Sequence, residues 1–183
     1  MRYLAGTPYH GLTIRSNREM DFKDELAIYA DASFAGDLDT RRSTTGFVLM
    51  VGGAAIRWTS RTQRHVTSST AEAELEAVND AFLELLSWHA AFVDMGLLGE
   101  DEGIELMEDN QAAIFFANGE WVRERSRHMA IRYYRVREIV ASGLITLVYI
   151  ASADNIADIM TKNLVLVTFM APASLMMGEP LDN

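Results

Sequence analysis

Residues 26–59, LAIYADASFAGDLDTRRSTTGFVLMVGGAAIRWT, are the stretch that decides the fold. Short apolar runs rich in β-branched and aromatic residues predict three strands, over Leu26–Ala30, Gly46–Val51 and Ala54–Thr59. Gly52-Gly53 separates the second run from the third and is a two-residue hairpin signal. We therefore expect an antiparallel meander of three strands.

The next segment predicts a long helix, and further strands and helices follow it. Ser69 and Glu72 form a capping-box pattern, which predicts that the helix begins near Thr70. Helical spacing gives it a buried stripe of Leu75, Val78, Phe82, Leu85, Leu86, His89 and Phe92. Beyond it we expect a strand over 104–108, helices over 111–117 and 126–141, a strand over 144–150 and a final helix over 155–162. The predicted fold class is α/β, a five-stranded mixed sheet (three antiparallel strands, then parallel strands) flanked by helices.

Four carboxylates lie where an apolar run stops or a helix begins: Asp31, Glu74, Asp109 and Asp158. Asp31 and Asp109 follow two strands that would be parallel neighbours, and open α/β sheets place their sites at the carboxyl edge of the strands. A single aspartate at a strand end is usually a turn or cap residue. Several carboxylates facing one another, however, are the oxygen ligands that Mg²⁺ prefers. The sequence therefore predicts an acidic metal site at this edge.

Three glutamates compete for the inward position on the long helix. At roughly 100° per residue, Glu74 lies at the edge of the buried stripe, in line with Val78 and Leu85. Glu72 and Glu76 are predicted to point further towards solvent. Helix geometry therefore favours Glu74.

Composition excludes several classes of protein. The chain of 183 residues is 49% hydrophobic, enough for one well-buried domain. Cysteine is absent, which excludes a disulfide framework and a thiolate zinc site. The sequence has neither an apolar run long enough for a bilayer nor a signal peptide, so we expect a soluble, intracellular protein with no membrane partner.

The charge is strongly acidic, with a formal net charge of −10. This argues against a generic nucleic-acid binder, because phosphate contacts need lysine and arginine. Arginines nevertheless gather in two stretches, 57–64 and 123–137. Scattered surface charge and a nucleic-acid contact are both open interpretations of these stretches.

Five motifs occur in order at domain-sized spacings: YADASFAGDLDTRRSTTGFV (29–48), TSSTAEAELEA (67–77), EDNQAAI (108–114), SRHMAIRYYRVRE (126–138) and DNIADIMTK (154–162). Together they resemble the ribonuclease H domain of copia-type LTR retrotransposon Pol polyproteins, from residue 1 to residue 164. The chain departs from the family pattern at Ala130 and Tyr134 in the basic helix and at Ala151 and Asn163 near the end. None of the four carboxylates is lost.

The resemblance implies an activity, a metal set and a substrate. Asp31, Glu74, Asp109 and Asp158 would be both the catalytic residues and the ligands of two Mg²⁺ ions, with Mn²⁺ as a substitute. Asp31 would bridge the ions, Glu74 would lie on the leaving-group side and Asp158 on the water side. The substrate would be the RNA strand of an RNA–DNA hybrid, cleaved during reverse transcription. The residues expected to contact it are Gln111, Ser33, Arg61, Ser68, His128 and Asn155.

The same resemblance predicts the organisation of the chain. Residues 1–22 would be a remnant of the connection to reverse transcriptase, 23–164 the ribonuclease H domain and 165–183 a C-terminal tail. The reverse transcriptase domain of the same polyprotein would be a partner, and the location cytoplasmic, in virus-like particles. Two alternatives stay open, an integrase-like nuclease and a non-catalytic remnant that serves as a binding or scaffold module.

Overall fold

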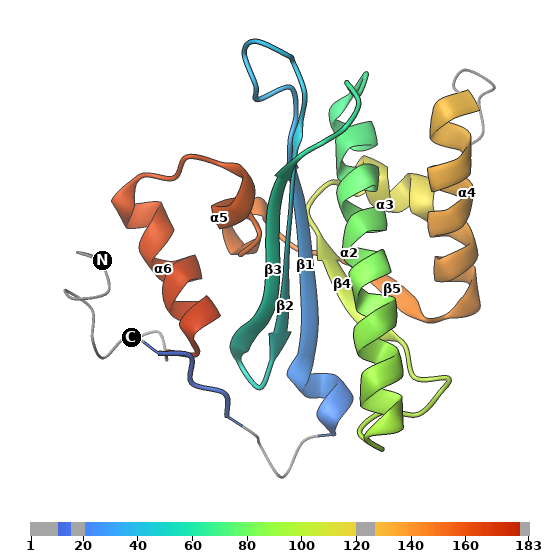
Figure 1. The fold of residues 1–183 in the computed structure, drawn as a ribbon, viewed down its shortest axis with the longest axis vertical. Helices are drawn as coiled ribbons and strands as arrows, with labels where there is room; N and C mark the ends of the chain where they lie inside the picture. The colour runs from blue at the N-terminus through green and yellow to red at the C-terminus, as the bar shows by residue number, and fades with distance from the viewer. Residues whose placement is uncertain (1–10, 16–20, 120–126, 180–183) are drawn as a thin grey trace.

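A mixed sheet of five strands forms the centre of the computed structural model, which describes residues 11–15, 21–119 and 127–179 (Figure 1). The strands are β1 (Leu26–Ser33), β2 (Thr44–Val51), β3 (Ala54–Thr62), β4 (Ile104–Glu108) and β5 (Ile145–Tyr149), in the spatial order β3-β2-β1-β4-β5. β1 and β3 pair antiparallel with β2, while β1–β4 and β4–β5 are parallel. The predicted fold class is confirmed.

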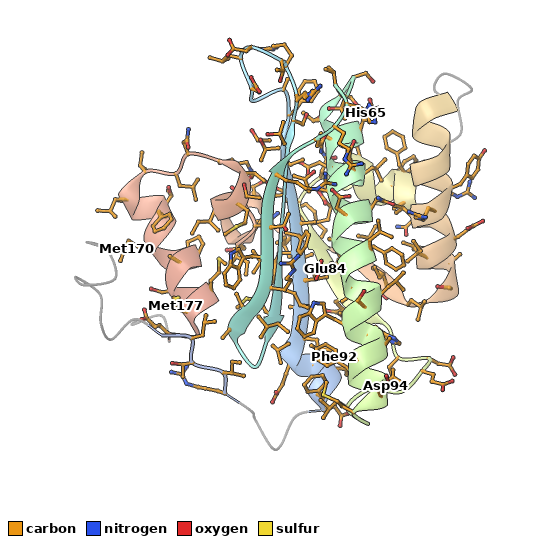
Figure 2. All side chains as sticks on the ribbon, in the orientation of Figure 1. His65, Glu84, Phe92, Asp94, Met170 and Met177 are labelled. Carbon is orange, nitrogen blue, oxygen red and sulfur yellow. The ribbon has the colours of Figure 1, made fainter. Side chains whose placement is uncertain are left out.

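Helices cover both faces of this sheet (Figure 1). One face carries α2 (Thr70–Asp94), α3 (Gln111–Ala117) and α4 (Arg127–Ser142), and the other carries α5 (Asp158–Thr161) and α6 (Leu166–Met177). Two short 3-10 helices, η1 (Phe22–Glu25) and η2 (Ser152–Asp154), complete the described elements. Each face has its own cluster of buried apolar side chains, so the sheet separates two cores. The first core is the cluster on the α2 face, and the second core is the cluster on the α6 face. Figure 2 shows Phe92, a member of the first core, near the end of α2, and Met177 near the end of α6.

Local sequence signals account for the turn and the helix start. Gly52 and Gly53 have φ of +56° and +76°, the left-handed pair that a two-residue hairpin requires. Ser69 is the N-cap of α2, and its hydroxyl accepts a hydrogen bond from the Glu72 N–H at 3.2 Å. The Glu72 carboxylate bonds in return to the N–H and hydroxyl of Ser68, both at 2.6 Å. The Glu72 carboxylate therefore bonds to the residue before the N-cap, whereas in the standard capping box it accepts the N–H of the N-cap residue itself.

Two predicted boundaries were wrong near the site. β1 continues to Ser33 instead of ending at Ala30, because β2 pairs with it as far as Ser33↔Thr44. Asp31 thus lies inside the strand, opposite Gly46. The helix predicted over 155–162 is shorter, since 152–154 form η2 and α5 has only four residues, Asp158–Thr161.

The buried surface of α2 also differs from the predicted stripe. Leu86 is 39% exposed, although it was predicted to be buried. Glu76 is only 4% exposed, so the prediction that it points towards solvent was wrong. The reason is that α2 packs on β1 and β2 and also against α3 and α4, so a second side of the helix is covered.

The segment predicted as a C-terminal tail contains α6, which packs on the sheet. Met176 is buried in the second core with Val48 and Met50. The Thr13 N–H donates to the Met177 carbonyl at 2.9 Å, which places residues 11–15 beside the end of α6. The domain limits at residues 22 and 164 stay predictions.

None of the helices in the described ranges is long and apolar enough to cross a membrane.

Candidate metal centre

Two groups of three carboxylates meet at the carboxyl edge of β1 and β4 and share one member. Asp31, Asp109 and Asp158 form the first group, and Glu74, Glu108 and Asp109 the second. Within each group, one oxygen per residue lies within 4.8 Å of the others. All four carboxylates expected from the sequence therefore come together, with Glu108 as an additional member.

Lys162 lies between two members of the first group. Its Nζ donates to Asp158 Oδ1 at 2.5 Å and to Asp31 Oδ1 at 3.1 Å, while the Thr161 hydroxyl bonds to the other oxygen of Asp31. Burial lowers the pKa of Lys162, but the two carboxylates raise it more, and the net shift is upward. Burial raises the pKa of Asp158 against the hydrogen bond from Lys162. The ammonium group supplies positive charge where these carboxylates converge.

Helix α5 is too short to hold itself in place, and the sheet fixes it. Asn155 Nδ2 donates to the Ala30 carbonyl at 2.8 Å, and its Oδ1 accepts the Ala157 N–H at 3.1 Å. The Ser60 hydroxyl donates to the Met160 carbonyl at 2.5 Å. A Cβ at Gly46 would lie 2.6 Å from Thr161 Cγ2, so only glycine lets α5 lie this close to β2. These contacts place Asp158 beside Asp31.

Asp109 and Glu74 are positioned by the elements that precede them. Asp109 directly follows β4, and the Ser152 hydroxyl donates to its Oδ2. Asn110 then caps α3 by accepting the Ala113 N–H at 3.1 Å. Glu74 lies in the first turns of α2, where buried Gln63 donates to the Ala73 carbonyl at 3.0 Å. The start of α2 is thereby tied to the end of β3.

Glu74 and Glu108 are buried carboxyl groups with few hydrogen-bond partners among the described residues. Glu74 is 6% exposed and Glu108 is 0% exposed. Glu108 Oε1 accepts the Asn110 N–H at 3.0 Å, but in the described part of the chain neither Glu108 Oε2 nor Glu74 Oε2 has a hydrogen-bond partner. Burial raises the pKa of both groups, and the neighbouring carboxylates raise it further.

Sequence reasoning missed Glu108. Its signal is the alternation of β4: Ile104 and Leu106 face the core that contains α2, and Glu108 is the next residue of the same parity. A charged residue at a core position of a buried parallel strand is rare unless it is paired or binds a metal.

The residues predicted to contact substrate have varied surroundings. Ser33, at the end of β1, is partly exposed, and Gln111, at the start of α3, is exposed. Exposed Ser68 binds Glu72. Asn155 is 2% exposed and its amide bonds to the Ala30 carbonyl, and a substrate contact there stays a prediction. The side chain of His128 lies outside the described residues.

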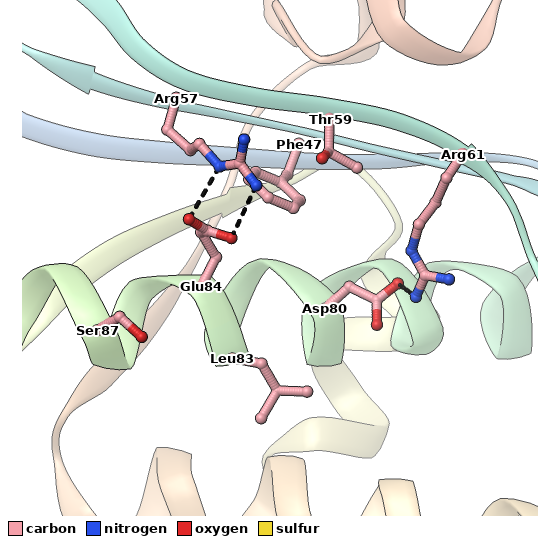
Figure 3. Close-up of a pocket in the computed structure, with 8 residues that line it drawn as sticks. All are labelled: Phe47, Arg57, Thr59, Arg61, Asp80, Leu83, Glu84 and Ser87. Carbon is pink, nitrogen blue, oxygen red and sulfur yellow. Dashed lines mark hydrogen bonds and ion pairs between the residues drawn. The ribbon is translucent and has the colours of Figure 1, made fainter.

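Arg61 and Arg57 pair with acidic residues of α2. Figure 3 shows Arg61 bonded to Asp80, and Arg57 bonded to Glu84 with a shortest distance of 2.8 Å, on the rim of a pocket between β3 and α2. Arg57 and Arg61 are 45% and 40% exposed, so each ion pair adds little stability. Their positive charge is partly neutralised within the protein. A nucleic-acid contact at Arg61 stays a prediction.

The donor set fits divalent ions that prefer oxygen ligands. Every side chain in the two groups offers a carboxylate, and one buried oxygen each of Glu74 and Glu108 lacks a partner among the described residues. Ions of this kind are held by carboxylates, carbonyls and water, whereas thiolate and imidazole ligands favour other metals.

Comparison with known sequences finds relatives among transposon polyproteins. The chain is 32% identical over 169 residues to the retrovirus-related Pol polyprotein from transposon RE2 of Arabidopsis thaliana, covering 92% of this chain and 11% of the polyprotein. It is 33% identical over 162 residues to that from transposon TNT 1-94 of Nicotiana tabacum, covering 88% of this chain and 12% of the polyprotein. The chain therefore spans only a small part of these relatives. No protein-family model matches it.

Comparison with solved structures finds ribonucleases H. The structure of LC11-RNase H1, isolated from compost, has a TM-score of 0.58 at 19% identity and covers 78% of this chain and 94% of that one. The same enzyme in complex with RNA/DNA hybrid has a TM-score of 0.54 at 16% identity, with 74% and 93% covered. The resemblance stated from the sequence is confirmed: the relatives are retrotransposon Pol polyproteins, and the fold is that of ribonuclease H.

Proposed function

We propose that this chain is the ribonuclease H domain of a copia-type Pol polyprotein and hydrolyses the RNA strand of RNA–DNA hybrids with divalent metal ions. The observation that carries the proposal is the convergence of Asp31, Glu74, Asp109 and Asp158, from separate elements, at one edge of a ribonuclease H fold. Relatives and structural neighbours support the same assignment.

Some residues of such a site would bind the metal ions, and others position these ligands. Asp31, Asp109 and Asp158 would hold one ion, and Glu74 with Asp109 would hold a second, which makes Asp109 the carboxylate shared by the two groups. That Asp31 also bridges both ions stays a prediction. Bound ions would polarise the scissile phosphate and lower the pKa of a water molecule. Asn155 and Gly46 keep Asp158 against Asp31, and Ser152 orients Asp109.

The order of the carboxylates argues against the integrase-like alternative. In that family the glutamate ligand comes last, on a late helix. Here Glu74 is on α2, and the late ligand is Asp158 on α5. The remnant alternative is left to experiment.

Hybrid cleavage by the purified chain tests the proposal. We expect cleavage of the RNA strand with Mg²⁺ or Mn²⁺, and loss of activity with Ca²⁺, which tolerates flexible coordination of six to eight ligands. Single-stranded RNA and duplex DNA of the same sequence are the control substrates. Cleavage that persists in excess chelator, or no cleavage with any metal, would contradict it.

The proposed partner is the reverse transcriptase domain of the same polyprotein. With a net charge of −10 and two arginines paired to acids, this chain alone should bind hybrid weakly and in a salt-dependent way. A tethered domain that grips the same hybrid raises its effective concentration at the site.

We therefore expect fusion to a reverse transcriptase domain to raise hybrid cleavage at least about tenfold, or roughly 1.4 kcal/mol in apparent binding. The measurement compares the bare chain and the fusion at matched low and moderate salt. Equal rates with little response to salt would show that the chain carries a complete binding surface. The intracellular location stays a prediction.

A further inference from the structure

Glu108 is placed where a purely structural carboxylate would be costly. It ends β4 on the face that packs under α2 and is fully buried. Among the described residues its Oε1 accepts the Asn110 N–H at 3.0 Å, and its Oε2 has no partner. An ionised carboxylate buried without a counter-charge is strongly disfavoured.

Glu108 does not stand alone. Glu74 on α2 lies close to Glu108, and Asp109 follows Glu108 in the chain. The three carboxylates therefore offer oxygens within 4.8 Å of one another. Glu74 and Glu108 each direct a buried oxygen that has no hydrogen-bond partner in the described part of the structure. Two unpartnered acceptors in one acidic cluster are atoms that a bound cation would satisfy.

The cluster lies on the opposite side of the sheet edge from Asp158. By strand alternation Asp31 faces α5, where Thr161 and Lys162 bind it, whereas Glu108 faces α2. Asp109 belongs to both groups.

Charge agrees with this arrangement. Asp31, Glu74, Glu108, Asp109 and Asp158 carry five negative charges when ionised. Lys162 and two divalent ions would balance these five charges, whereas a site without Glu108 would keep a positive excess before substrate binds.

We propose that Glu108 is a fifth carboxylate ligand, which together with Glu74 and Asp109 holds the second divalent ion on the α2 side of the sheet edge. This inference rests on the proposed metal-dependent function and adds one residue to its site.

Mn²⁺ binding to the whole chain, followed by calorimetry and electron paramagnetic resonance, tests the proposal without any nuclease assay. The variant is Glu108→Gln, which keeps the shape and removes the charge. The matched control is Glu105→Gln, on the same strand but exposed and on the other face. We expect Glu108→Gln to weaken one of two Mn²⁺ sites about tenfold or more, the range seen when a metal site loses a supporting group. Glu105→Gln should bind as the wild type does.

A structural carboxyl group would behave differently. If Glu108 only shares a proton with Glu74, Glu108→Gln keeps both Mn²⁺ affinities, and the proposal is overturned. Should Glu108→Gln fail to fold, Glu108→Asp is the second variant, because it retains the charge but withdraws it by one methylene. We expect Glu108→Asp to weaken the same Mn²⁺ site. Wild-type Mn²⁺ affinity in Glu108→Asp also overturns the proposal. If the wild type fails to cleave hybrid while Glu108→Gln loses an ion, the nuclease function fails and the ligand assignment stands.

Discussion

Asp31→Asn should lower hybrid cleavage by more than roughly a hundredfold, beyond the usual loss when a metal ligand loses a residue that hydrogen-bonds to it. Asp31 is 1% exposed, belongs to the first carboxylate group and receives hydrogen bonds from Thr161 and Lys162. The amide keeps the shape of the side chain but removes the charge that would hold an ion. Single-turnover cleavage of a labelled hybrid at saturating Mg²⁺ measures the loss.

Two glutamates of α2 form the matched comparison. Glu74→Gln should be as inactive as Asp31→Asn, whereas Glu72→Gln should retain activity, since the Glu72 carboxylate bonds to Ser68 at the helix start and belongs to neither carboxylate group. The metal-free stabilities should differ too. Burial raises the pKa of Glu74 to about 10, so without metal Glu74→Gln replaces one neutral group with another, whereas Asp31→Asn loses the ion pair with Lys162 at 3.1 Å. An inactive Glu72→Gln with an active Glu74→Gln would overturn the assignment of the helix face.

Without metal, the free energy of unfolding should fall as pH rises from about 5.5 to 7.5. Burial and neighbouring carboxylates raise the folded pKa of Glu74 above its ordinary value of 4.5, and burial raises that of Glu108 likewise. Above pH 4.5 the folded state therefore binds more protons than the unfolded state, so stability is fully present below that pH and is lost as pH rises towards the folded pKa. The slope is about 1.4 kcal/mol per pH unit for each proton retained.

Divalent ions should reverse this dependence, because they bind the deprotonated carboxylates. Urea unfolding at pH 5.5, 6.5 and 7.5, with chelator and with saturating Mg²⁺, measures both limits. Stabilisation by Mg²⁺ should be small at pH 5.5 and largest at pH 7.5. Glu74→Gln should flatten the slope in chelator, with Glu72→Gln as the control. A flat profile in chelator with no response to Mg²⁺ would contradict both the protonation of this cluster and its role in binding metal.

The local signals of this chain were sufficient for most of the fold. Gly52-Gly53 can adopt the positive φ angles of a hairpin, and Ser69 can cap a helix, whatever lies around them. The strand and helix periods follow from side-chain spacing alone, so the order of the elements and the carboxyl edge of the sheet were predictable. Asp109 and Asp158 adjoin a strand or helix boundary, and helix spacing selected Glu74, whereas Asp31 was found although it lies inside β1.

Only the tertiary structure decided which carboxyl groups are buried and what lies beside them. Glu76 is buried on a helix that packs against α3 and α4 as well as the sheet, and Glu108 faces Glu74 because parallel pairing places the end of β4 beside β1 under that helix. Lys162 reaches Asp31 across 131 residues of sequence. Helix α6, with Pro172 inside it and no side-chain N-cap, has weak local signals and packs its end on β3. Sequence periodicity describes one element at a time, whereas burial and charge pairing depend on the elements that pack around it.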